Sequence, residues 1–189
     1  MATKYNYWFW ENVFSEQEIK QIVYDVDQNY DKIEPEKLGA TDSQGHSKKN
    51  LHCKQISYYK IKSKLDNVLD RAYAINSHEF GYNLYPKNDH DVINLNVYNE
   101  NQKANYDWHI DECRSETHDI KLTVLINCST EYYEGGIFQI FHNEEFEIPE
   151  FNKPGSMIMF KSYMNHRVTP VTKGERRSLA FFLKGPSFQ

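Results

Sequence analysis

The chain has 189 residues, a net charge of −5, a sequence pI of about 5.9 and a mean hydropathy of −0.79. This length fits one domain with a substantial core, and 14 Tyr, 11 Phe and 3 Trp are unlike a disordered chain. The chain has no run rich in lysine and arginine, which a nucleic-acid-binding surface would need, so we expect no nucleic-acid partner. No stretch approaches ~20 apolar residues, so we also expect no membrane span.

The three cysteines are Cys53, Cys113 and Cys128. Their odd number and the absence of a CxxC pair argue against a disulfide framework and favour a reducing compartment. The first residues, "MATKYNYWFWENVF", lack the apolar run of a signal peptide. We therefore expect a cytoplasmic protein.

Two helices are predicted in the first half of the chain. The segment "FSEQEIKQIVYDVDQNY" opens with Ser15 followed three residues later by Glu18, which is a capping box. Apolar residues then recur at helical spacing, which predicts a helix over about 15–29. A second apolar face in "SKLDNVLDRAYAINSHEFG" predicts a helix over about 63–79.

A long polar loop separates these helices, and short strands follow them. Residues 31–50 contain Pro and Gly, and a loop of this length is typical of a functional lid or of disorder. After residue 90, seven or eight short β-rich runs predict a sandwich or barrel. We expect one domain over 1–189, mainly β, with a helical part at about 1–85 and a β core at about 90–185.

The segment "YDWHIDECRSETH" holds an H-x-D pair, His109 and Asp111. On a strand, positions i and i+2 point to the same face, so the two side chains can offer ligands to one point. Among the other histidines His166 stands apart, because it opens a later strand that can meet the pair across the interior of a closed or double sheet. Two histidines and one carboxylate are the ligand set of non-heme Fe(II) enzymes. A zinc set of His109, Asp111, Cys113 and His118 is the alternative.

Two adjacent arginines, Arg176 and Arg177, follow His166 by ten and eleven residues, past the turn "TKG". A hairpin of this length would bring an arginine near the metal but outside its ligand shell. Its guanidinium can then bind a carboxylate through two parallel hydrogen bonds. Strand alternation lets only one of the two arginines point inward. A solvated arginine pair on an edge strand is the other interpretation.

Taken together, these motifs resemble the Fe(II)/2-oxoglutarate dioxygenase superfamily. The similar stretches are "LNVYNENQKANYDWHID", "LTVLINCSTEYYEGGIFQIF" and "KPGSMIMFKSYMNHRVTPVTKGERRSLAFFL". The ordered set is H-x-D, E-G-G, P-G-x-x-x-x-F and H-x-V-x-P-V-x-x-G-x-R, over about residues 92–184. The likeness is strongest to the prolyl 4-hydroxylase-like branch, which includes the PKHD-type hydroxylases.

The resemblance implies a double-stranded β-helix, also called a jelly roll, with iron ligated by His109, Asp111 and His166. It implies that Arg176 binds the far carboxylate of 2-oxoglutarate and that Tyr98 helps. Fe(II), 2-oxoglutarate and O₂ are the implied cofactor and co-substrates, with succinate and CO₂ as products. The expected reaction hydroxylates an amino-acid residue, such as prolyl, in a protein or peptide, or a free amino acid.

Further residues near the H-x-D pair are substrate-binding candidates, namely Tyr106, Trp108 and Arg114. For Tyr106 and Trp108 core packing is the slightly favoured alternative, and for Arg114 solvation is favoured. Trp108 should face opposite His109 on a regular strand. Gly135 and Gly136 are expected to allow a tight turn or a close strand approach.

Two other classes of protein remain open from sequence. One is a non-catalytic binding module on the same fold with a structural metal. The other is a zinc or cupin-like isomerase or hydrolase on a similar barrel. An intact set of three ligands with an arginine favours the oxygenase, because a scaffold needs no such set.

Overall fold

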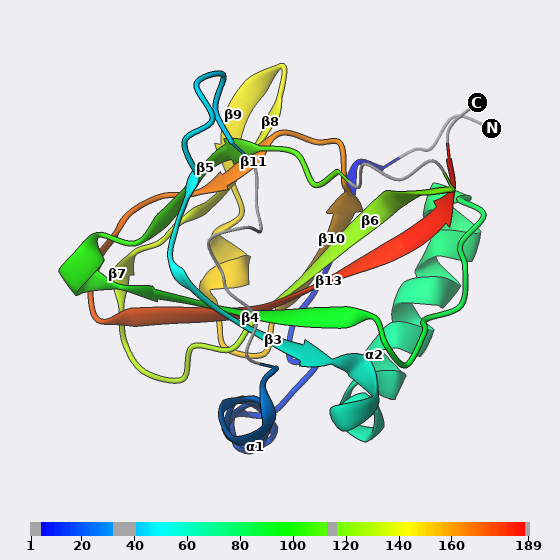
Figure 1. Ribbon diagram of the computed structural model, residues 1–189, viewed down its shortest axis with the longest axis horizontal. Coiled ribbons are helices and arrows are strands. Elements are labelled where there is room, and N and C mark those ends of the chain that lie inside the picture. The colour runs from blue at the N-terminus through cyan, green and yellow to red at the C-terminus, as the bar shows by residue number, and fades with distance from the viewer. Residues whose placement is uncertain (1–4, 32–40, 113–116, 188–189) are drawn as a thin grey trace.

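A computed structural model describes residues 5–31, 41–112 and 117–187 of the protein. Figure 1 shows two antiparallel β-sheets facing each other, with both helices outside the space between them. The six-stranded major sheet has the order β1-β10-β6-β13-β4-β3, and the five-stranded minor sheet has the order β2-β5-β11-β8-β9. Strands distant in sequence are neighbours in both sheets, which is the double-stranded β-helix that the sequence predicted.

The bounds of the elements are as follows. The helices are α1 (Glu16–Asn29) and α2 (Lys62–Ile75). The strands of the major sheet are β1 (Tyr7–Trp10), β3 (His52–Ser57), β4 (Val92–Asn99), β6 (His118–Asn127), β10 (Met157–Lys161) and β13 (Glu175–Pro186). Those of the minor sheet are β2 (Lys49–Asn50), β5 (Asn105–His109), β8 (Phe138–His142), β9 (Glu144–Glu147) and β11 (His166–Val168), while β7 (Glu134–Gly135) and β12 (Val171–Lys173) form a separate pair.

Helix α1 begins where its capping box predicts. The Ser15 hydroxyl accepts a hydrogen bond from the Glu18 amide, and the Glu18 carboxylate accepts one from the Ser15 amide at 2.8 Å. These bonds satisfy amide donors that the first helical turn leaves free. The apolar face of α1 then packs on the outer face of the major sheet.

Helix α2 is followed by a π-helical turn, Asn76–Phe80, so the predicted second helix is continuous in space but changes its winding at residue 76. The turn ends at Gly81, whose φ of +72° lies in the left-handed region that favours glycine. The buried face of α2 joins the same core as α1. Among the described residues, no helix is long and apolar enough to span a membrane.

The major sheet is buried on both faces. Its outer face, with residues such as Leu95 and Phe181, packs against the two helices. Its inner face faces the minor sheet, and Tyr98, Phe138 and Phe160 belong to this second core. A sheet covered on both sides is a rigid support for side chains that project from its inner face.

The N-terminal half contributes more than helices, contrary to the sequence prediction. Strand β1 extends the major sheet beside β10, and β3 forms its other edge beside β4. Neither strand shows a clear alternation of apolar and polar residues. β1 is a run of four aromatic residues, all half-buried, and β3 is mostly polar. In the 31–50 loop, residues 32–40 lie outside the described residues, whereas residues 49–50 form β2 beside β5.

Candidate metal and co-substrate site

His109 and His166 are direct cross-strand neighbours. Strand β11 pairs antiparallel with β5, and His166 lies opposite His109 in the register. The two imidazole centroids are 4.1 Å apart, and both residues are buried. The sequence predicted their meeting across the interior of the barrel. The structure brings them together through hydrogen-bonded neighbours in one sheet, which fixes their separation more firmly.

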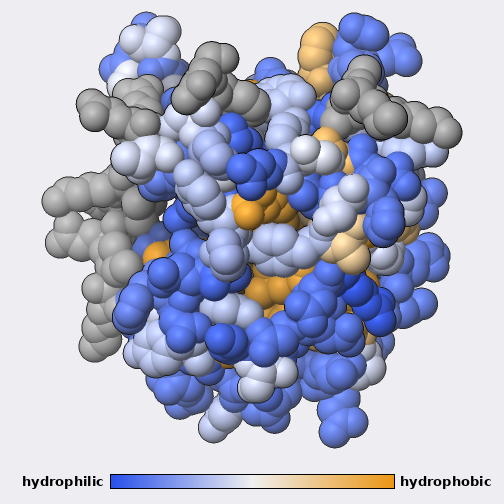
Figure 2. All heavy atoms as spheres, turned by 90° about the vertical axis from the view of Figure 1, so that its right-hand side faces the viewer, coloured by the Kyte–Doolittle hydropathy of each residue, from blue (hydrophilic) through white to orange (hydrophobic). Residues whose placement is uncertain are grey.

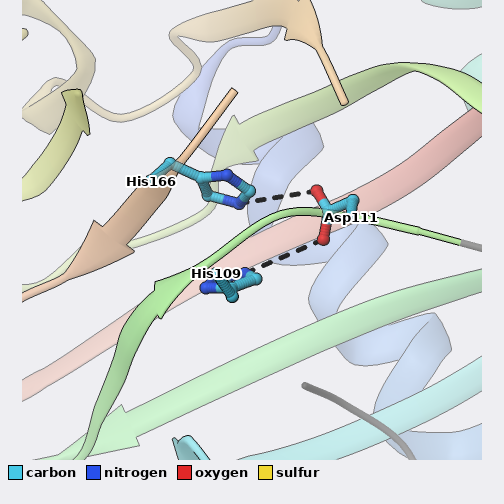
Figure 3. Close-up of side chains that lie close together, drawn as sticks. All are labelled: His109, Asp111 and His166. Carbon is cyan, nitrogen blue, oxygen red and sulfur yellow. Dashed lines mark ion pairs between the residues drawn. The ribbon is translucent and has the colours of Figure 1, made fainter. Parts of the chain in front are cut away.

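Asp111 completes the cluster from the loop that follows β5. Its amide donates to the Ser162 carbonyl oxygen at 2.9 Å, so strand periodicity is not what positions it. Figure 3 shows its carboxylate between the two imidazoles: Oδ1 lies 3.7 Å from His109 Nε2, and Oδ2 lies 3.4 Å from His166 Nε2. Within the described part of the chain, this is the one group of three or more His, Cys, Asp or Glu that could hold a metal ion.

Hydrogen bonds to backbone carbonyl oxygens hold both imidazoles in the tautomer that a metal ligand needs. His109 Nδ1 lies 2.7 Å from the Asp107 carbonyl oxygen, and His166 Nδ1 lies 2.9 Å from that of Met164. A carbonyl oxygen only accepts, so each Nδ1 carries the proton and each Nε2 keeps its lone pair. Burial, together with the nearby His166, lowers the pKa of His109 to about 2, so this ring is neutral at physiological pH.

Aromatic rings hold the two imidazoles in place. Tyr106 stacks on His109 with centroids 3.5 Å apart and an interplanar angle of 11°. A register shift between His166 and Val168 lets Tyr106 and His109, three residues apart, share one face. Phe160 contacts His166 edge-on at 4.7 Å. The rings therefore have little freedom to turn away from Asp111.

Thr123 on β6 orients the carboxylate from the opposite sheet. Its hydroxyl donates to Asp111 Oδ2 at 2.7 Å, and its side chain is buried. Sequence reasoning missed this residue. Its position inside the apolar run "KLTVLIN" is a weak signal of such a role. A hydroxyl group at an inward-facing position of this strand is buried, and a buried hydroxyl needs a hydrogen-bond partner.

Of the two adjacent arginines, Arg176 is the buried one, with 1% of its surface exposed. Its Nη1 donates to Ser178 Oγ at 3.2 Å, whereas its Nε and Nη2 are buried without a hydrogen-bond partner. The guanidinium carbon lies 5.1 Å from the Tyr98 ring centroid. Arg177 points outward, where Nε donates to Glu175 at 2.6 Å. Alternation in β13 separates them, as the sequence predicted.

The hairpin explanation for the position of Arg176 was wrong. β13 lies in the major sheet and pairs with β4 and β6, whereas His166 belongs to the minor sheet. Arg176 lies opposite Tyr98 on β4. The arginine is therefore placed by the pairing of β13 with β4, and the turn at "TKG" only starts the strand.

A cavity of about 920 Å³ runs between the two sheets. The three metal-binding candidates line it, together with Tyr98, Tyr106 and Ser178. Arg176 does not line the cavity but contacts two of its lining residues, Tyr98 and Ser178. From the end of the molecule where β13 finishes, hydrophobic atoms are visible near the centre of the face within a hydrophilic surround (Figure 2).

The other predicted residues lie elsewhere or outside the description. Trp108 contacts Arg167, whose guanidinium carbon is 4.6 Å from its ring, and Phe141 on the outer side of the minor sheet. It faces opposite His109, as alternation predicts, and does not line the cavity. Arg114 and Cys113 lie outside the described residues. His118 begins β6 opposite Pro186 and is not part of the metal-binding group.

The two predicted glycines differ in their surroundings. A Cβ on Gly135 would lie 2.2 Å from the Pro170 carbonyl oxygen, which agrees with the predicted close strand approach. A Cβ on Gly136 would lie 2.8 Å from Arg176 Cδ and 2.9 Å from Val171 Cγ2. Gly136 therefore makes the space that the arginine side chain occupies.

The comparisons with known proteins agree with this geometry. Residues 93–184 match the family model of the 2OG-Fe(II) oxygenase superfamily. A prolyl-4-hydroxylase from Pseudomonas putida superposes with a TM-score of 0.68 at 13% identity, covering 97% of this chain and 95% of that one. The viral collagen prolyl hydroxylase of Paramecium Bursaria Chlorella virus-1, solved with 2OG, gives 0.67 at 14% identity, with 96% and 97% covered.

A third structure, a prolyl hydroxylase from Trichoplax adhaerens in complex with a peptide fragment of the hypoxia inducible factor oxygen degradation domain, gives 0.66 at 15% identity. It covers 95% of this chain and 84% of that one. A search of curated protein sequences found no significant match. Residues 93–184 are similar to the 2OG-Fe(II) oxygenase superfamily, and the fold of the chain is prolyl 4-hydroxylase-like.

The described residues fit the cofactor and co-substrates of this superfamily, which are Fe(II), 2-oxoglutarate and O₂. Two neutral imidazole nitrogens and one carboxylate form a three-ligand set, which leaves other metal positions open. The unpartnered Nε and Nη2 of Arg176 are two donors that a carboxylate would satisfy. A closed structural zinc site would need a fourth protein ligand, and the described residues offer none in this group.

Proposed function

We propose that the protein is an Fe(II)- and 2-oxoglutarate-dependent oxygenase. Its proposed reaction hydroxylates an amino-acid residue in a protein or peptide, with a prolyl residue as one candidate, or a free amino acid. The observation that carries the proposal has two parts: two Nε2 lone pairs and a carboxylate converge in the cavity, and the buried guanidinium of Arg176 keeps two nitrogens without a partner next to the lining residues Tyr98 and Ser178. The peptide complex of the Trichoplax adhaerens relative supports a peptide substrate.

In this proposal His109, Asp111 and His166 are the iron ligands. Fe(II) and 2-oxoglutarate, when bound, would supply together with O₂ the oxidising chemistry that replaces a C–H bond by C–OH, with one oxygen atom entering the product and the other entering succinate as CO₂ is released. The protein contributes fixed ligand orientation: each Nδ1 is bonded to a backbone carbonyl, and Asp111 is bonded to Thr123. The surrounding aromatic rings keep bulk water away from the reacting atoms.

Arg176 and Tyr98 are the proposed binding residues for 2-oxoglutarate. The two unpartnered nitrogens of Arg176 would bind the far carboxylate, because a buried charge without a counter-charge is costly and an anion removes that cost. Burial raises the pKa of Tyr98, so its hydroxyl stays protonated and can donate. Tyr106 remains a candidate substrate contact, since it lines the cavity beside His109.

Release of CO₂ from carboxyl-labelled 2-oxoglutarate tests the proposed function. With Fe(II) and O₂ present, we expect CO₂ and succinate to form in equal amounts and a pool of peptides and free amino acids to raise the rate. Mass spectrometry should then show one added oxygen on a member of that pool. A protein that binds iron yet forms no succinate under any of these conditions would instead be a binding module.

Replacing Thr123 with valine is expected to weaken Fe(II) binding by roughly 10–100-fold, the usual range for a lost outer partner of a metal ligand. The valine keeps the shape of the side chain but removes the donor to Asp111. Metal titration with a chelator competitor measures the change. Thr172→Val, at an exposed position on β12, is the matched control and should bind iron as the wild type does.

Gly136→Ala is expected to weaken 2-oxoglutarate binding by about tenfold, because the new methyl group displaces Arg176. Gly45→Ala is a matched control: its φ is +85°, also left-handed, but a Cβ there meets nothing within 4 Å. Both variants carry the backbone penalty, so only Gly136→Ala should change the dissociation constant for 2-oxoglutarate. Equal affinities in the two variants would show that Arg176 tolerates the shift.

A further inference from the structure

Residues of β4 and β13 line the cavity where these two central strands of the major sheet stop pairing. The pairing of β4 with β13 runs from Asn99 opposite Glu175 to Asn94 opposite Ala180. Beyond Ala180 the segment before β4 takes over: the Tyr85 amide donates to the Lys184 carbonyl oxygen at 2.8 Å, and Lys87 Nζ donates to that of Phe182 at 3.3 Å. An ammonium group thus lies in the split between the strands.

Two lysines share one carboxylate at this split. Lys184 Nζ lies 2.8 Å from Asp91 Oδ1, and Lys87 Nζ lies 3.8 Å from Asp91 Oδ2. The Lys87 side chain is only 6% exposed. Burial and the neighbouring Lys184 lower the pKa of Lys87 to about 8, against the opposing effect of Asp91. This cluster therefore carries more positive charge than its own carboxylate balances, and all three residues line the cavity.

The surrounding lining is also basic for an acidic protein. Lys48 and Lys49 line the same cavity near His109, and the other carboxylates among the described lining residues are Asp111 and Glu112. Asp111 is one of the proposed metal ligands, so a bound metal ion would neutralise its charge. The chain as a whole has a net charge of −5, so four lysines around one cavity are a local departure from that balance.

The strand register places Lys184 and Arg176 on opposite sides of the residue of β13 that pairs with Thr123. Thr123, which binds Asp111, lies opposite Phe182 on β13. Lys184 is two residues beyond Phe182 on β13, whereas Arg176 is six residues before it, so the two cationic groups lie on opposite sides of this level of the strand. A 2-oxoglutarate that extends from the metal toward Arg176 therefore points away from the lysines.

We propose that Lys87 and Lys184 form an anion-binding subsite that receives a carboxylate of the substrate. This inference rests on the proposed function and narrows its substrate class to molecules with a carboxylate within about 10 Å of the hydroxylated carbon, as judged from the strand spacing. Two sources have this chemistry: the α-carboxylate of a free amino acid, and an acidic side chain next to the target residue of a peptide.

Anaerobic calorimetry on the full-length protein with Fe(II) and 2-oxoglutarate tests the subsite. One pair of probes is L-proline and L-prolinamide, and the other is N-acetyl-Pro-Glu-amide and N-acetyl-Pro-Gln-amide. We expect the carboxylate member of one pair to bind about tenfold more tightly than its neutral partner. The pair that discriminates identifies the source of the carboxylate.

The variants Lys87→Met and Lys184→Gln should each remove this preference while 2-oxoglutarate binding persists. Lys87→Met keeps the apolar stem, so it should leave the fold intact. Lys62→Gln is the matched control, because Lys62 pairs with Asp89 at the surface at 3.1 Å and does not line the cavity. This variant should retain the full preference.

Equal affinities within both pairs, or no binding of either carboxylate probe, would overturn the subsite. So would a preference that survives in both lysine variants, in which case the cluster only seals the split between β4 and β13. Binding of 2-oxoglutarate to the iron-loaded protein is measured in the same samples. Its loss would instead count against the proposed function, so the two failures are distinguishable.

Discussion

Replacing His166 or His109 with alanine is expected to remove bound Fe(II) and to lower succinate formation by more than about a thousandfold, beyond the roughly 10–100-fold typical of outer partners. Each Nε2 lies close to the Asp111 carboxylate. Each histidine is also the only imidazole that its strand contributes to the metal-binding group. Without one of them, two ligands remain, which is too few for a stable site. Iron content and succinate yield are measured together.

His142→Ala is the matched control for these variants. His142 ends β8 in the same minor sheet, and its side chain is exposed. It should keep both iron and activity, which separates loss of a ligand from loss of any histidine in this sheet. If His166→Ala retained stoichiometric iron and normal turnover, the assignment of the three ligands would be wrong.

Arg176→Met is expected to raise the dissociation constant of 2-oxoglutarate by about 100-fold or more, since a buried charge pair loses one partner. Two nitrogens of Arg176 lack partners without a ligand, so the methionine should not lower the free energy of unfolding of the ligand-free protein by more than about 1 kcal/mol. The wild type should gain about 2.7 kcal/mol at a 2-oxoglutarate concentration of 100 times its dissociation constant. The variant should gain no more than about 0.4 kcal/mol at that concentration.

Thermal unfolding with and without 2-oxoglutarate measures both effects. Arg177→Met is the control, because Arg177 binds Glu175 at the surface and has a third of its side chain exposed. It should respond to 2-oxoglutarate as the wild type does. A normal thermal response in Arg176→Met, or its loss in Arg177→Met, would reverse the assignment of the two arginines.

Much of the secondary structure could be predicted because it depends on local pattern. Helix α1 begins at its capping box, and the strands after residue 90 lie where β-rich runs alternate with turn residues. Strands β1 and β3 escaped prediction because tertiary pairing, with β10 and β4, stabilises sequences without a clear alternation.

The site was predictable to the extent that motifs carry it. The resemblance supplied His109, Asp111 and His166 as a set, and the structure brings these three together. It could not supply Thr123, whose contact with Asp111 arises from the stacking of two sheets. Likewise, the stacking of Tyr106 on His109 depends on a register shift that leaves no mark in the sequence.

The cluster of Lys87, Asp91 and Lys184 illustrates the same limit. Lys87 and Lys184 are nearly a hundred residues apart, and they meet because the β4–β13 pairing stops at Ala180. Alternation predicts which side chains face inward. Where two strands separate is decided by packing of the whole sheet, and no single segment encodes it.

The most direct test of the central claim is an anaerobic titration of the metal-free protein with Fe(II) and then 2-oxoglutarate, followed by visible absorption. We expect a weak charge-transfer band that requires both additions, is absent in His166→Ala, and needs far more 2-oxoglutarate in Arg176→Met. Iron shown to be bound without any such band would mean that 2-oxoglutarate does not chelate the metal in this cavity, and would contradict the proposed site.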